Sequence, residues 1–184
     1  MISIHTADLR RVAPTLRAGQ RILLSGTIYT ARDAAHKRLM ALLDEGAPLP
    51  FPLTDGVIYY CGSTPAPEGR PIGACGPTTS SRMDPYTPRL YDLGLCATIG
   101  KGERDAATCA AIARNHGVYL CAIGGAGALL AKCIKKSEIV AYEDLGAEAI
   151  RRLEVEDFPV TVIIDSEGNN LYESGKAEYL AGKK

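Results

Sequence analysis

The stretch RILLSGTIYTARDAAHKRLMALLDEG, residues 21–46, contains both element types on which the fold depends. Residues 21–30 form an apolar run rich in β-branched side chains, which predicts a buried strand that ends at Gly26-Thr27. Residues 31–46 then show apolar positions at helical spacing and end at Gly46, a residue type that commonly terminates helices. A strand that leads directly into a helix favours an α/β fold.

The same alternation of strand and helix continues beyond this stretch. Apolar runs and helical spacing predict three more strands and three more helices, namely strands at 56–62, 95–100 and 118–125 and helices at 84–94, 104–117 and 127–134. Residues 158–173 are predicted to form a hairpin-like pair that turns at SEGNN, residues 166–170. Buried strands with helices between them predict an α/β fold with a central mixed sheet and covering helices.

Length and composition favour one soluble domain. A chain of 184 residues is near the usual size of a single domain, so residues 1–184 are expected to form one. Hydrophobic residues at 46% and charged residues at 23% match ordinary globular proteins. The least ordered parts are expected at 44–56, 65–73 and the tail 175–184, and none of these divides the chain.

The charge balance limits the possible partners. The formal net charge is zero, so no general surface field attracts nucleic acid or an anionic membrane, and neither is expected as a partner. No apolar run is long enough for a membrane span, and the N-terminal residues lack the apolar core of a signal peptide. We therefore expect a cytoplasmic location, with any bound anion held by a local cluster of cations.

Six cysteines stand at positions 61, 75, 96, 109, 121 and 133. No two of them have the close spacing that is typical of metal and iron–sulfur sites. Free cysteine is among the most often buried residue types, and several of these six lie in apolar runs. The pattern favours reduced core thiols, and no metal ligands are expected in this chain.

The first candidate site is the start of the predicted helix in TARDAAHKRL, where Arg32, His36 and Lys37 follow a strand. Residues four apart share a helix face, and strand-to-helix junctions are where α/β proteins place ligand-binding groups. The alternative is a solvated basic helix start in which Asp33 pairs with Lys37 across one turn.

The second candidate is CGPTTSSRMD, residues 75–84, in which four hydroxyl residues, Thr78 to Ser81, precede Arg82. A helix N-terminus with free N–H groups, hydroxyls and a guanidinium suits a carboxylate or phosphate. The alternative is a hydroxyl-rich helix cap with a surface arginine. A third candidate, Lys101, lies between two glycines in ATIGKG, and its alternative is an ordinary turn lysine.

Taken together, GTIYTARDAAHKRL, CGPTTSSRMDPYTPRL and ATIGKG, followed by FPVTVIIDSEGNNLYE, closely resemble the β subunit, or C-terminal domain, of class I iron–sulfur-dependent fumarate hydratases and tartrate dehydratases. The resemblance extends over nearly the whole chain. It implies a swivelling β/β/α domain that works with a separate α subunit in an α2β2 assembly. It also implies a [4Fe–4S] cofactor that is bound by three cysteines of the α subunit and not by this chain.

The resemblance implies a set of substrate-binding residues as well: Arg32, Thr78, Arg82 and Lys101 match the positions that line the substrate side of the cleft in that family. Three of the four carry positive charge, and arginine binds carboxylates through a bidentate fork. Such a set suits a small dicarboxylate. The resemblance offers Thr78 as the catalytic base, whereas Thr79 and the two serines are expected to be caps only.

The activity that the resemblance implies is a hydro-lyase reaction, the reversible hydration of fumarate to malate in the tricarboxylic acid cycle. Three alternatives stay open at this point. These alternatives are the β subunit of an L(+)-tartrate dehydratase, a module that binds a dicarboxylate without catalysis, and a purely structural subunit. The four residues named above serve fumarate and tartrate equally.

Overall fold

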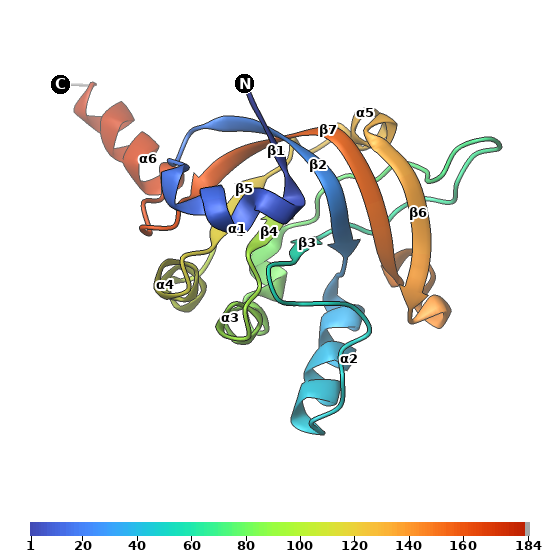
Figure 1. Cartoon of the computed structure of the whole chain (residues 1–184). Coiled ribbons are helices and arrows are strands. Elements are labelled where there is room, and N and C mark those ends of the chain that lie inside the picture. The colour runs from blue at the N-terminus through green and yellow to red at the C-terminus, as the bar shows by residue number, and fades with distance from the viewer. Residues whose placement is uncertain (183–184) are drawn as a thin grey trace.

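A computed structural model describes residues 1–182 and has the expected mixed α/β architecture, with helices around one seven-stranded sheet (Figure 1). The strands are β1 (Ile2–His5), β2 (Arg21–Thr30), β3 (Val57–Tyr59), β4 (Ala97–Gly100), β5 (Val118–Cys121), β6 (Ile134–Ala141) and β7 (Ile150–Ile164). The α-helices are α1 (Leu9–Val12), α2 (Asp33–Asp44), α3 (Thr87–Asp92), α4 (Ala106–Arg114), α5 (Gly127–Lys132) and α6 (Leu171–Ala181). Short 3-10 helices are η1 (Thr6–Asp8), η2 (Ala13–Thr15), η3 (Ser80–Met83) and η4 (Glu143–Glu148).

The sheet curls into a closed ring of strands. Strands β1 to β5 pair in parallel, each with the next, and β7 runs antiparallel to β2, β5 and β6. Because β7 pairs with β2 on one side and with β5 on the other, the strands β2, β3, β4, β5 and β7 form a ring. The sequence predicted the central mixed sheet but gave no indication of this closure.

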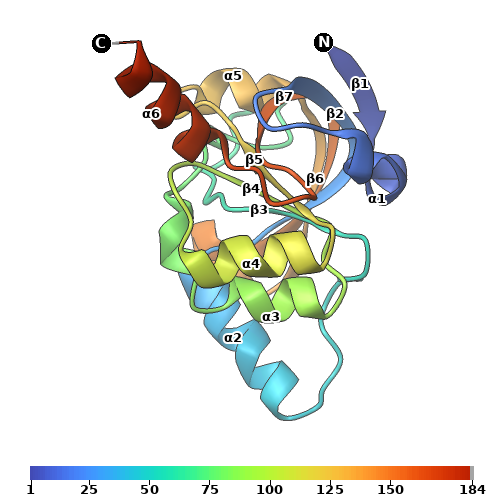
Figure 2. The ribbon, with the colours of Figure 1, turned by 90° about the vertical axis from the view of Figure 1, so that its left-hand side faces the viewer.

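The sheet separates two apolar cores. One core lies inside the ring of strands and includes Leu24 of β2, Tyr59 of β3 and Phe158 of β7. The other lies between the outer face of the sheet and the helices α2, α3 and α4, which lie side by side along it (Figure 2). Neighbouring residues of a strand point to opposite faces, so Ile58 packs towards these helices while Tyr59 points into the ring.

A bulge at a glycine allows β2 to pair in parallel with two strands, β1 and β3. The first half of β2 pairs with β1, its last residues pair with β3, and its register with β7 shifts between Leu24 and Gly26. Gly26 has φ +113°, and a Cβ there would lie 2.4 Å from Oγ1 of Thr6. Only glycine fits this position without displacing a neighbour, and the bulge bends the strand from one partner to the next.

The hairpin predicted at residues 158–173 has its turn, across which Ile164 and Asn170 form an antiparallel bridge, but its second strand is wrong. Strand β7 ends at Ile164, and the following turn leads into helix α6. The Asp165 side chain accepts hydrogen bonds from the backbone N–H groups of the turn, and the Asn170 side chain caps α6 by accepting from the Tyr172 N–H. The tail from 175, expected to be poorly ordered, continues α6 to Ala181, and residues 183–184 lie outside the described part.

Within residues 1–182, no helix combines the length and apolar character that crossing a membrane requires.

Candidate functional site

The four candidate residues lie at the carboxyl ends of the parallel strands. Arg32 follows β2 by two residues, and Lys101 comes directly after β4. Thr78 is held beside the end of β3, where its N–H donates to the Tyr60 carbonyl at 2.8 Å, and Arg82 follows in η3. This edge is where parallel sheets usually bind ligands, so residues 69 positions apart in sequence meet in one region.

One carboxylate links the two arginines. The Arg82 Nε donates to Asp33 Oδ1 at 2.9 Å, and the Arg32 Nε lies 3.7 Å from Asp33 Oδ2. The side chain of Arg32 is 23% exposed and that of Arg82 is 50% exposed. Among the described residues, Asp33 forms ion pairs with these arginines and not with the exposed Lys37, so the alternative of an Asp33–Lys37 pair is wrong.

Glu148 supports the start of helix α2 from a distant part of the chain. Its Oε2 accepts a hydrogen bond from the Ala34 N–H at 2.9 Å, and its Oε1 lies 3.7 Å from a terminal nitrogen of Arg32. The carboxylate therefore satisfies a free N–H of the first helical turn and faces the arginine at the same time. Glu148 was not predicted from the sequence, because no local pattern connects residues 114 positions apart.

The first serine of the hydroxyl run, Ser80, holds two backbone segments together and does not cap a helix. Its Oγ accepts from the Lys101 N–H at 3.0 Å and from the Tyr119 hydroxyl at 2.8 Å. A Cβ at Gly100 would lie 1.9 Å from this oxygen, so the close approach requires glycine. Thr79, which precedes η3, makes no capping hydrogen bond through its side chain. The expectation that these two residues are caps is therefore wrong.

The backbone next to Thr78 lies beside Lys101. Thr79 and Lys101 form a parallel bridge, and the Ser80 N–H donates to the Lys101 carbonyl at 2.9 Å. Within residues 1–182 neither the Thr78 hydroxyl nor the Lys101 ammonium has a hydrogen bond or an ion pair with another side chain. Both groups are thus available to a ligand.

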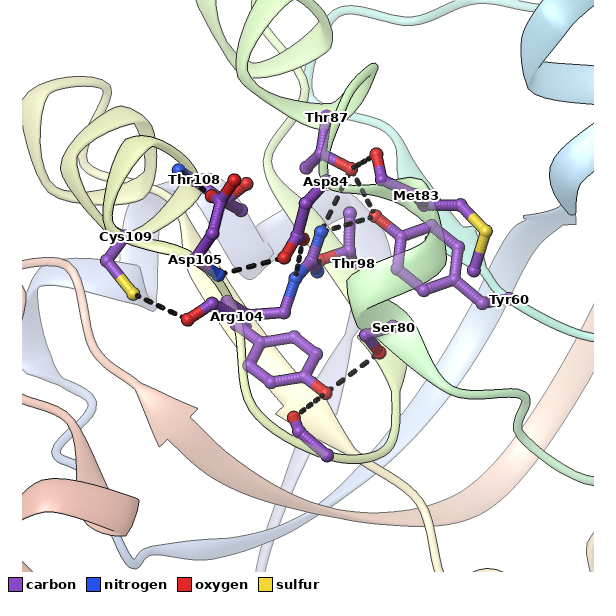
Figure 3. A network of polar contacts seen from close by, with 12 residues as sticks. Tyr60, Ser80, Met83, Asp84, Thr87, Thr98, Arg104, Asp105, Thr108 and Cys109 are labelled. Atoms are coloured by element: carbon purple, nitrogen blue, oxygen red, sulfur yellow. Dashed lines mark hydrogen bonds and ion pairs between the residues drawn. The ribbon is translucent and has the colours of Figure 1, made fainter.

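A buried arginine fixes the loop that follows Lys101 (Figure 3). The Arg104 Nε donates to Asp84 Oδ1 at 2.6 Å, and Asp84 Oδ2 accepts from the Asp105 N–H at 2.8 Å. The guanidinium lies over the rings of Tyr60 and Tyr119, 5.2 and 4.9 Å from their centroids. Nothing in the sequence predicted this network, which ties the segment after Thr78 to the loop after Lys101.

His36 does not join the site, although it shares the first turns of α2 with Arg32. Its side chain is fully buried, and its Nδ1 donates to the Arg32 carbonyl at 2.8 Å. Burial, helped by the charge of Arg104, lowers the pKa of His36 from 6.5 to about 4, against the opposing effects of the Arg32 carbonyl and Asp33. His36 is therefore neutral at neutral pH.

This shift predicts a loss of stability in acid. Below pH 6.5 the unfolded chain binds a proton at His36 that the folded chain rejects down to about pH 4. Lowering the pH from 7 to 5 should therefore remove about 2 kcal/mol of stability through this group. In His36→Asn, which keeps an N–H donor and cannot titrate, urea unfolding at the two pH values should show a smaller fall. The exposed His116→Asn is the control and should keep the wild-type fall; equal falls in both variants would exclude His36 as the source.

The cysteines do not form a metal centre with their neighbours. Three are buried and three are partly exposed: Cys61, Cys75 and Cys96, and Cys109, Cys121 and Cys133. Burial raises the pKa of the Cys121 and Cys133 thiols and brings that of Cys96 to about 11, which disfavours the thiolate that binds metal. Within residues 1–182, no three His, Cys, Asp or Glu side chains are grouped to hold an ion. These residues therefore do not fit an iron–sulfur cluster.

Comparison with known proteins gives consistent matches. Residues 1–175 match the family described as the fumarase C-terminus. The chain is 41% identical over 174 residues to fumarate hydratase 2 of Leishmania major, which covers 90% of this chain and 31% of that protein. It is 43% identical over 155 residues to the anaerobic class I fumarate hydratase of Escherichia coli K12, covering 83% of this chain and 28% of that protein.

A third relative has a different length. The putative L(+)-tartrate dehydratase subunit beta of Methanocaldococcus jannaschii is 37% identical over 164 residues, covering 86% of this chain and 84% of that protein. The chain thus spans about a third or less of the fumarate hydratases but most of the tartrate dehydratase subunit. Its matches are one region of longer enzymes and one separate subunit of similar length.

Proposed function

Because this chain belongs to the fumarase C-terminus family, we propose that it is the β subunit of a two-subunit hydro-lyase that hydrates fumarate to malate reversibly. In this proposal the chain binds the carboxylates of the substrate, and an α subunit completes the active site. The observation that carries the proposal is the arrangement of Arg32 and Arg82 around Asp33, with Lys101 at the same edge of the sheet.

The proposed substrate-binding set is Arg32, Thr78, Arg82 and Lys101. Fumarate and malate are dianions, and the set offers two guanidiniums and one ammonium to them. Each hydrogen bond between a charged donor and a carboxylate contributes about 1.5–3 kcal/mol net, so two arginines are enough to orient both ends of a small diacid. Lys101 adds a point charge without the fixed geometry of a fork.

Hydration adds a hydroxyl group to one carbon of the double bond and a proton to the other. In the reverse direction a proton leaves the carbon beside a carboxylate, and negative charge spreads onto that carboxylate as the bond breaks. Arginine and lysine donors that are already in place stabilise this charge in the transition state. We assign this role to the three cations of the site.

We assign the proton transfer to Thr78. A neutral hydroxyl is a poor base, so its oxygen must pass its own proton to an acceptor before or during the step. The described part of this chain places no hydrogen-bonding partner on that hydroxyl. The proposal therefore assigns the acceptor to the α subunit, together with the [4Fe–4S] cluster, for which residues 1–182 of this chain offer no group of ligands.

The proposal extends to the assembly. Residues 1–184 are proposed to act as one swivelling β/β/α domain, packed beside the α subunit in a cytoplasmic α2β2 enzyme of the tricarboxylic acid cycle. The family match over residues 1–175 supports the single domain, and the relative named subunit beta supports a partner chain.

L(+)-tartrate dehydration is the second candidate. The specific observation in its favour is the 37% identity over 164 residues to a relative named L(+)-tartrate dehydratase subunit beta. The hydro-lyase chemistry is the same for both substrates, and tartrate differs from malate by one added hydroxyl. The two candidates differ only in what surrounds the carbon that carries this group.

The test is co-expression with the α subunit and an oxygen-free assay on fumarate and on L(+)-tartrate. We expect turnover of one diacid by the complex and none by this chain alone, which should be colourless. Hydratase activity of the isolated chain would contradict the division of labour. A complex that binds a diacid without turning over either one would instead support a non-catalytic binding subunit.

The same assay tests the role of Thr78. In the complex, Thr78→Ala should lower kcat roughly 100-fold, because a group that transfers a proton contributes about that much to the rate. The melting temperature should hardly change. Thr79→Ala is the matched control, since the exposed Thr79 side chain makes no capping bond, and it should keep wild-type kcat. A Thr78→Ala complex with normal turnover would remove Thr78 from the mechanism.

A further inference from the structure

We infer that Asp33 is a positioning residue for substrate: it holds the guanidinium of Arg82 by its Nε, faces the Nε of Arg32, and so sets the orientation in which both arginines meet a diacid. The inference rests on the proposed function and extends it to a residue that the family motif assigns no role. It starts from the two ion pairs that one carboxylate makes, at 2.9 Å to Arg82 and 3.7 Å to Arg32.

Asp33 binds the Nε edge of the Arg82 guanidinium and leaves the terminal nitrogens to other partners. A guanidinium offers five N–H donors, and a carboxylate can bind across its two terminal nitrogens or along the edge that contains Nε. Asp33 takes the Nε of Arg82, and among the described residues no ion pair or hydrogen bond occupies the terminal nitrogens of that side chain. The end of the Arg82 fork is therefore free for a second carboxylate.

Arg32 is more enclosed than Arg82 and faces neighbours in several directions. Its Nε faces Asp33, one terminal nitrogen faces Glu148, and a Cβ at Gly62 would lie 2.8 Å from the other. The Arg32 Nε and Asp33 Oδ2 are buried and lack hydrogen-bond partners, so these two atoms face each other without a hydrogen bond between them. Asp33 is thus fixed chiefly through Arg82 and through its own place as the first residue of α2.

A role of Asp33 in charge and a role in orienting the arginines predict opposite effects of Asp33→Asn on dianion binding. Asp33 and Glu148 balance Arg32 and Arg82, so neutralising Asp33 makes the cluster more positive. If charge alone governed binding, a dianion would bind more tightly after Asp33→Asn, because Coulomb attraction increases. If Asp33 orients the two forks, the same variant binds the dianion more weakly. The sign of the change in KM therefore distinguishes the two roles.

The experiment uses the complex with the α subunit and compares wild type, Asp33→Asn, Asp33→Ala and Asp44→Asn on the diacid that wild type turns over. We expect KM to rise roughly tenfold in Asp33→Asn and further in Asp33→Ala, which loses both acceptor oxygens, with a smaller change in kcat. The inhibition constant of succinate, a saturated dianion, should rise in parallel. Asp44 pairs with Arg89 at the other end of α2, so Asp44→Asn should keep wild-type kinetics.

Melting temperatures measured on the same samples separate binding from folding, and Asp33→Asn, which keeps the size of the side chain, should melt close to wild type. An unchanged or lower KM in Asp33→Asn, with an active wild-type complex, overturns this inference and leaves the proposed function standing. A wild-type complex that neither binds nor turns over fumarate or tartrate overturns the proposed function, and this inference falls with it.

Discussion

Replacing Arg104 with methionine is expected to lower the free energy of unfolding by about 3–5 kcal/mol, because the Asp84 carboxylate then stays buried without its partner. The Arg104 side chain is fully buried and that of Asp84 is 5% exposed. A carboxylate in this position cannot recover its hydration in the folded state. The lost contacts of the guanidinium with the rings of Tyr60 and Tyr119 add to the cost.

Thermal unfolding should show this as a fall in melting temperature of about 6–20 °C for a chain of this size. The control is Arg114→Met, which breaks an ion pair with Asp92 that has two hydrogen bonds but is about half exposed. It should melt close to wild type, since water replaces the lost contact. A double variant, Arg104→Met with Asp84→Leu, should regain part of the loss. Equal shifts in the two single variants would show that burial of the Arg104 pair does not matter.

The second large effect is expected at the proposed substrate arginines. In the complex with the α subunit, Arg82→Ala should lower kcat/KM on the order of 10³-fold, because a charged pair that loses one partner costs about 2–5 kcal/mol. Arg82 is half exposed, so its removal leaves no cavity and the melting temperature should hardly fall. Arg32→Ala should lose a similar amount of activity, and some stability as well, because its side chain is more buried.

Arg82→Lys separates charge from geometry. A lysine keeps the positive charge but has no planar fork, so it should not restore more than a small part of the lost activity. Arg89→Ala is the control for a surface arginine, since Arg89 lies in α3 and pairs with Asp44 away from the site. Turnover near the wild-type rate in Arg82→Ala would remove Arg82 from the substrate-binding set.

Local patterns were sufficient for the elements with a strong apolar period. The strand predicted in residues 21–30 is β2, although β2 continues past the predicted end at Gly26-Thr27 to Thr30, and the helix predicted at 31–46 contains α2. Strand β6 and the first half of β7 were missed, because their sequences, IKKSEIVA and IRRLEVED, mix charged and apolar residues. The charged residues of β6, Lys135, Lys136 and Glu138, are exposed, so they lie in solvent while the strand still pairs with β7. A pattern dominated by charge gives a weak strand signal.

The site shows the same division between local and long-range information. Arg32 and Lys101 come shortly after predicted strands, and the parallel order of β2, β3 and β4 in the structure places both at one edge of the sheet. The roles of Asp33, Glu148 and Arg104 depend on contacts between segments far apart in sequence. Asp33 has Lys37 within one helical turn, which made a local ion pair the natural expectation, yet Arg82 reaches it from η3. Tertiary packing thus places Arg82, and not Lys37, against the Asp33 carboxylate.

The closed ring of strands has a consequence for how the chain folds during synthesis. Strand β2 pairs with β7 along nearly its whole length, although more than 120 residues separate the paired positions. Contacts of such high contact order carry a large loop-closure entropy, which slows folding. On the ribosome the inner face of β2 cannot be covered until β7 has been made, so most of the chain is translated before the ring can close. The nascent chain therefore exposes apolar strand surface for longer than a protein built from local pairs, and it is correspondingly more prone to aggregate in that interval.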